Sequence, residues 1–104
     1  MLSSNVMENF NSKIFDCLDE ALLVLGKNEK EHVLFALENE YHITAKNIGS
    51  NPKLEEALKE TLGHSGSAFV IMHTLENIVS SFKISRAYGD NLARAIGAAK
   101  KSAI

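Results

Sequence analysis

Apolar side chains recur along this chain at alternating steps of three and four residues, and this spacing restricts the possible folds more than any other feature. The first such row comprises Met7, Phe10, Ile14, Cys17, Ala21 and Val24. Steps of three and four residues place side chains on one face of an α-helix. No stretch of four or more residues alternates convincingly between apolar and polar side chains, so the sequence predicts no sheet. The predicted fold class is therefore all-α.

We expect a single helical domain over residues 1–104, with about five helices in orthogonal or bundle-like packing. A chain of 104 residues, of which 45% are hydrophobic, can bury one modest core. Gly26 and Gly63 stand where helices should end, and Asn51-Pro52 stands where one should begin. The predicted helices lie near residues 4–25, 29–41, 52–62, 67–83 and 86–102.

Two further signals refine these boundaries. Asn28 and Glu31 have the spacing of a capping box, which predicts a helix start at Asn28. Residues 89 and 90, Gly-Asp, can interrupt the last helix, with Asp90 capping a shorter one, while Tyr88 falls on its apolar side.

The segment Gly63-His64-Ser65-Gly66-Ser67 is predicted to be the joint between two helices, with Ser65 or Ser67 as the cap of the second. It lacks the second glycine and the preceding strand of a nucleophile elbow, and it lacks the Gly-Lys ending of a phosphate loop. A helix-turn-helix is the structural alternative. Its reading helix, expected to expose His73 and Thr74, has no Lys or Arg before Lys83, which disfavours DNA binding.

No group of residues predicts catalysis, a metal or a cofactor. The histidines His32, His42, His64 and His73 lie in four different local contexts without the spacing of a zinc site. Cys17 falls on the apolar row of the first helix, where a thiol behaves as a small hydrophobe. We therefore expect a protein that is not an enzyme.

The longest apolar runs, residues 21–25 and 68–72, are far shorter than the roughly 20 residues of a membrane-spanning helix. The first residues lack the basic start and apolar run of a secretory signal, and one cysteine cannot form an internal disulfide. These observations predict a cytoplasmic protein without a membrane span.

Charge is unevenly distributed along the chain. The net charge is −2, but residues 83–104 carry five cations against the single carboxylate of Asp90. The cations are Lys83, Arg86, Arg94, Lys100 and Lys101. This basic segment can contact nucleic acid, or it can dock on an acidic protein surface, and we favour docking because five cations make a thin phosphate footprint.

Residues 33–79 resemble a small all-helical domain of archaeal proteins that is described as an output domain of signalling systems. The resemblance rests on Phe35-x-Leu37-Glu38-x-x-Tyr41-x-Ile43, Ile48, Pro52-x-Leu54-Glu55-Glu56-Ala57-Leu58, Leu62-Gly63, Ala68, Ile71, Leu75 and Ile78. It implies a helical fold and a signalling context, and it supplies no catalytic residues.

The sequence favours a non-enzymatic protein-interaction module, homodimeric, in a cytoplasmic regulatory or signalling context. Its partners are a second copy of the chain and an unidentified regulatory protein. The first helix has an unusually wide apolar stripe and the last helix has a face of small residues, and we expect a partner to cover both. The predicted interface comprises Phe15, Leu18, Leu22, Leu23, Leu25, Leu92, Ile96 and Ala99. The alternative is a nucleic-acid-associated regulator that uses the five cations of the C-terminal segment.

Overall fold

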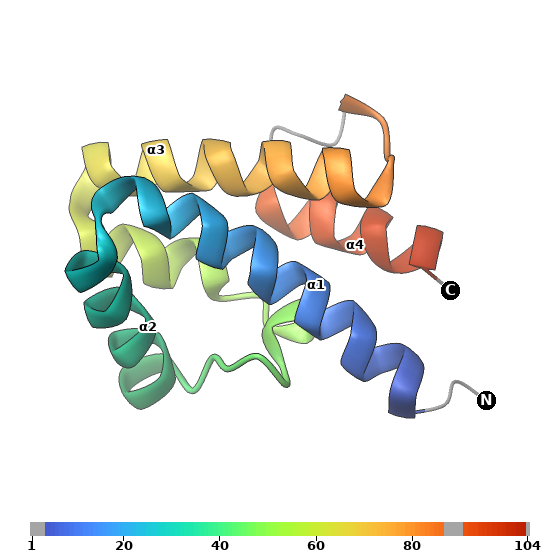
Figure 1. Ribbon diagram of the computed structural model, residues 1–104, viewed down its shortest axis with the longest axis horizontal. Coiled ribbons are helices and arrows are strands. Elements are labelled where there is room, and N and C mark those ends of the chain that lie inside the picture. The colour runs from blue at the N-terminus through green and yellow to red at the C-terminus, as the bar shows by residue number, and fades with distance from the viewer. Residues whose placement is uncertain (1–3, 87–90, 104) are drawn as a thin grey trace.

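The computed structural model describes residues 4–86 and 91–103, and within these ranges the chain is helical without strands, as predicted. The α-helices are α1 (Ser4–Leu22), α2 (Lys27–Tyr41), α3 (Leu54–Phe82) and α4 (Leu92–Ala103), and the 3₁₀ turns are η1 (Leu23–Leu25) and η2 (Ile48–Ser50) (Figure 1). Each of the five predicted helices overlaps one of these α-helices, with two of them inside α3.

The chain bends sharply at Gly63, inside α3 (Figure 1). Gly63 has φ 78° and ψ 179°, a conformation that glycine tolerates and other residues resist. The predicted joint over residues 63–67 was too long, because the helix resumes directly after Gly63. Ser65 and Ser67 therefore lie inside the helix, and the Ser67 hydroxyl donates to the His64 carbonyl at 3.1 Å instead of capping.

Two other predicted boundaries need correction. The helix α2 begins directly after Gly26 with no side-chain cap, so Asn28 lies inside the helix and the predicted capping box is wrong. The last helix starts at Leu92 and not near residue 86. Its cap is Asn91, whose side-chain oxygen accepts from the Arg94 amide at 3.1 Å. The expectations for Tyr88, Gly89 and Asp90 fall outside the described residues.

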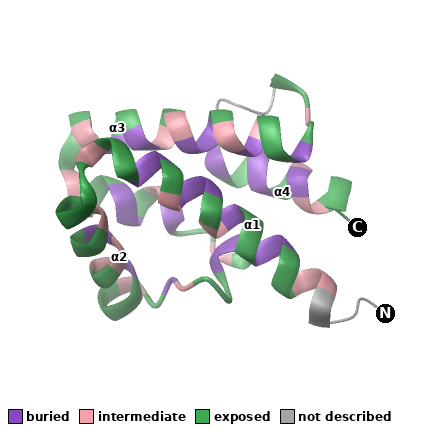
Figure 2. Ribbon diagram, in the orientation of Figure 1, coloured by how far each residue is buried: buried purple, intermediate pink, exposed green. Residues whose placement is uncertain are grey.

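The core forms mainly where α1 and α4 pack on α3, and buried side chains of α2 and the connector extend it (Figure 2). Helix α1 runs antiparallel to the second half of α3, since the Asn77 amide donates to the Cys17 carbonyl at 3.0 Å and the Phe10 ring packs edge-on against Phe82 at 5.6 Å. The central side chains, including Ile14 and Ile78, are fully buried. Each such side chain contributes about 1.5–3 kcal/mol through its transfer out of water.

Asn11 fastens the connector between α2 and α3 onto α1. Its side-chain amide donates to the Lys46 carbonyl at 2.7 Å, and its side-chain oxygen accepts from the Gly49 amide at 2.8 Å. The approach is so close that a Cβ at position 49 would lie 2.4 Å from the Phe10 ring. Only glycine fits there, and the buried Asn11 fixes how the connector crosses α1.

Candidate interaction surface

Five of the eight residues of the predicted dimer interface lie in the protomer's own core. They are Leu18, Leu22, Leu92, Ile96 and Ala99, all buried among α1, α3 and α4. Phe15 and Leu25 are half-buried against the same core, and only Leu23 is largely exposed, at 50%. The five buried side chains cannot meet a second copy, so this part of the predicted surface requires correction.

The physical reason is that other helices of the same chain pack against these apolar faces. The wide stripe of α1 contacts α2, α3 and η2, and the small-residue face of α4 packs on α3. Small side chains such as Ala95 and Ala99 are fully buried because they allow the two helix backbones to approach closely.

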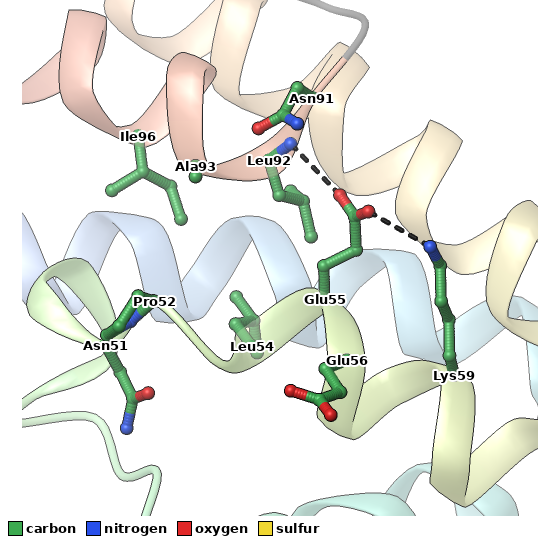
Figure 3. A pocket seen from close by; sticks show the side chains of 10 residues that line it. All are labelled: Asn51, Pro52, Leu54, Glu55, Glu56, Lys59, Asn91, Leu92, Ala93 and Ile96. Atoms are coloured by element: carbon green, nitrogen blue, oxygen red, sulfur yellow. Dashed lines mark hydrogen bonds and ion pairs between the residues drawn. The ribbon is translucent and has the colours of Figure 1, made fainter.

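The start of α4 is held by a polar joint with the first half of α3 (Figure 3). The Glu55 carboxylate accepts from the Leu92 amide at 3.3 Å and pairs with the Lys59 ammonium at 3.2 Å. A carboxylate at a helix N-terminus is stabilised by the helix dipole. These residues line a cavity of about 310 Å³, but Glu55 and Asn91 both serve the helix start. The joint is therefore structural in character.

Cys17 and Tyr41 have shifted pKa values, and both side chains are engaged within the fold. Burial raises the pKa of the Cys17 thiol, whose sulfur lies 3.8 Å from the Ser81 hydroxyl, so the thiol stays protonated. The Tyr41 hydroxyl donates to Glu60, and this bond raises the pKa of Tyr41 to about 12. In the described part of the chain no three His, Cys, Asp or Glu side chains are placed to hold a metal ion.

The five cations of the nucleic-acid alternative are divided among three places. Lys83 ends α3, and Lys100 and Lys101 lie in the last turn of α4. The Ser102 hydroxyl, which donates to the Phe82 carbonyl at 3.3 Å, brings these two helix ends together. Cations at helix C-termini complement the dipole. Arg94 lies in the first turn of α4 and Arg86 lines a groove on α3.

A recess lies between α1, α2 and the connector. It has a volume of about 450 Å³, and its lining includes the half-buried Phe15 and Leu34, with Glu38 and Lys46 as its charged residues. Leu18, one of the predicted interface residues, also lines the recess. Thr44 lines it as well, so the recess is lined by both apolar and polar residues.

A further surface is the solvent side of the second half of α3, where exposed residues recur at helical steps. We call this surface the outer α3 face and define it by Phe69, Met72, Glu76 and Ser80. Phe69 is 45% exposed and Met72 is 48% exposed. Beside them runs a groove of about 370 Å³. Neighbouring exposed apolar side chains form a patch that a binding partner can cover.

Sequence reasoning missed this surface because it assigned the polar residues of α3 to the outside. Thr74, expected to be exposed, is fully buried and donates to the Val70 carbonyl at 2.7 Å. Ser67 is likewise buried. Met72 ends the unbroken apolar run of residues 68–72, yet it is 48% exposed. The available signal was the run itself, because five consecutive apolar residues extend around every side of a helix and leave some of them exposed unless every side is covered.

Comparisons with known proteins identify no relative of this chain: no family model, curated protein or solved structure matches it. No helix in the described ranges combines the length and apolar character needed to cross a membrane.

Proposed function

We propose that this protein is a non-enzymatic protein-interaction module that acts as a homodimer in a cytoplasmic regulatory or signalling context. The observation that supports the proposal is the outer α3 face, where Phe69 and Met72 are exposed next to each other beside a groove. Exposing apolar surface to water is unfavourable, and covering it with a partner recovers that free energy.

Three side chains that could have carried chemistry, those of Asn11, Glu55 and Cys17, are instead engaged within the fold. Asn11 and Glu55 serve the connector and the start of α4, and Cys17 is a protonated buried thiol. The signalling context rests on the resemblance of residues 33–79 to archaeal output domains. The division of the five cations among three places gives the nucleic-acid alternative less support than a single basic surface would.

Sedimentation equilibrium over a wide range of protein concentrations tests the proposal. We expect a reversible monomer–dimer equilibrium in which the average mass rises from 11.4 kDa toward twice that value. A mass that stays at that of the monomer at every concentration would contradict the homodimer.

A further inference from the structure

The groove on the outer α3 face has the geometry of a hole in helix–helix packing. Its helical lining consists of Met72, Leu75, Glu76 and Val79, together with Ser80. The first four stand at positions i, i+3, i+4 and i+7, the four positions that surround one inserted side chain in knobs-into-holes packing. Arg86, which follows the end of α3, completes the wall.

The same face also carries a side chain suited to fill such a hole. Phe69 lies three residues before Met72, on the neighbouring turn of the helix, and is 45% exposed. Its ring packs edge-on against the His73 ring, with 4.5 Å between the centroids, which restricts its rotation. The outer α3 face therefore presents both a projecting aromatic ring and a hole.

We propose that the outer α3 face binds a second copy of this chain in an antiparallel C₂ arrangement, with Phe69 of each copy in the groove of the other. This inference rests on the proposed homodimer and assigns its interface. A parallel pairing in register places Phe69 against its own copy and leaves both grooves empty. In an antiparallel pairing the two helices run in opposite directions, so the Phe69 ring of each copy meets the groove of the other. The two-fold axis then passes midway between ring and groove, close to Met72.

The described lining of the groove suits an aromatic ring. Among the described residues of this lining, Glu76 and Arg86 are charged. A phenyl ring in the groove comes beside the partner's guanidinium, where a cation–π contact is favourable. The chain itself supplies such a ring in the exposed Phe69, which favours a second copy as the occupant.

Sedimentation equilibrium of two matched variants tests the assignment. Phe69→Glu places a charge at the centre of the proposed interface, and we expect the dimer dissociation constant to rise by about tenfold or more. Phe35→Glu makes the same change on α2, at a side chain that is 68% exposed and lies outside the face. We expect it to leave the dissociation constant unchanged, with circular dichroism confirming that both variants fold.

Thiol crosslinking provides a second readout that does not depend on a destabilising change. A short bismaleimide should link two copies of Met72→Cys, because the two-fold axis passes near residue 72, and should not link two copies of Phe35→Cys. The native Cys17 is buried and does not compete.

The outcomes separate the two claims. If the wild-type protein dimerises but Phe69→Glu does not weaken the dimer and Met72→Cys does not crosslink, the interface assignment is wrong and the homodimer stands. If the wild-type protein is monomeric throughout, the proposed homodimer itself fails. If Phe69→Glu weakens binding of a different protein while the chain alone stays monomeric, the face binds another partner and the second copy is excluded.

Discussion

The inner and outer faces of the second half of α3 belong to one helix but differ in what they bury. The inner face places Val70, Thr74 and Ile78 in the core, and it accepts a polar side chain because Thr74 bonds to a carbonyl of its own helix. The outer face leaves Phe69 and Met72 in water. The difference shows that fit to the neighbouring helices, and not apolar character alone, decided which face became core. The outer face therefore keeps exposed apolar surface that a partner can cover.

The largest expected effect comes from two consecutive leucines that contrast buried with exposed apolar surface. Leu22 is 0% exposed and Leu23 is 50% exposed. Leu22→Asp puts an unpaired carboxylate into the core and should lower the free energy of unfolding by about 3 kcal/mol or more. Leu23→Asp should change it by about 0.5 kcal/mol or less. Urea unfolding measures both, and equal losses would show that the boundary of the core is misplaced.

A smaller loss is expected when the polar contact on the buried side of α1 is removed. Asn11→Ala leaves the Lys46 carbonyl and the Gly49 amide without their partner. The cost should be about 1–3 kcal/mol, since the buried Gly49 amide and the part-buried Lys46 carbonyl both lose their partner. The control is Asn9→Ala on the exposed side of the same helix, which should be nearly neutral. Faster hydrogen exchange of the Gly49 amide in Asn11→Ala alone would locate the effect in the connector.

The orientation of both α3 faces depends on the bend at Gly63, and a pair of alanine substitutions tests where that bend lies. Gly63→Ala forces a side chain into φ 78° and should cost about 1–3 kcal/mol. Gly66 is helical, and a Cβ there would lie 3.5 Å from the Leu62 Cβ, an ordinary contact. Gly66→Ala should therefore stabilise the protein by about 0.5–1 kcal/mol. Thermal melts compare the two variants. If Gly66→Ala destabilised the protein more than Gly63→Ala, the bend would lie nearer Gly66, within the predicted joint over residues 63–67.

The helical fold could be predicted from the sequence because its signals are local. Apolar spacing identified the helices, and Gly26, Pro52 and Gly63 placed most of their boundaries to within a few residues. The start of α4 was predicted too early. Two side chains accept hydrogen bonds from the first amides of this helix: Asn91 binds the Arg94 amide, and Glu55, which is distant in sequence, binds the Leu92 amide. Such a partner leaves no periodic signal.

Most of the predicted interface residues proved to be core because a sequence does not say which apolar face its own chain will cover. Leu18 and Ile96 have the character of interface residues, and they are buried by neighbouring helices of the same protomer. The structural role of Asn11 was also missed, since its two partners lie in the connector far along the chain. Both errors have one cause, namely tertiary contacts that override local pattern.

The smallest expected effect concerns the basic residues outside the outer α3 face. If the cations serve helix ends, duplex DNA at low salt should give no shift, and replacing both Lys100 and Lys101 by Gln should leave the dimer unchanged. An electrophoretic shift assay with increasing salt provides the measurement. Binding that weakens steeply with salt and disappears in the double variant would favour the nucleic-acid alternative.

The central claim, that the outer α3 face is shared between two copies, is tested most directly by methyl NMR of the methionines during dilution. The chain has three methionines, of which Met72 lies on the outer α3 face and Met7 lies in α1. We predict that dilution shifts the Met72 methyl resonance toward its monomer position while the Met7 resonance stays fixed. A Met72 resonance that does not move while sedimentation shows the dimer dissociating would contradict the account.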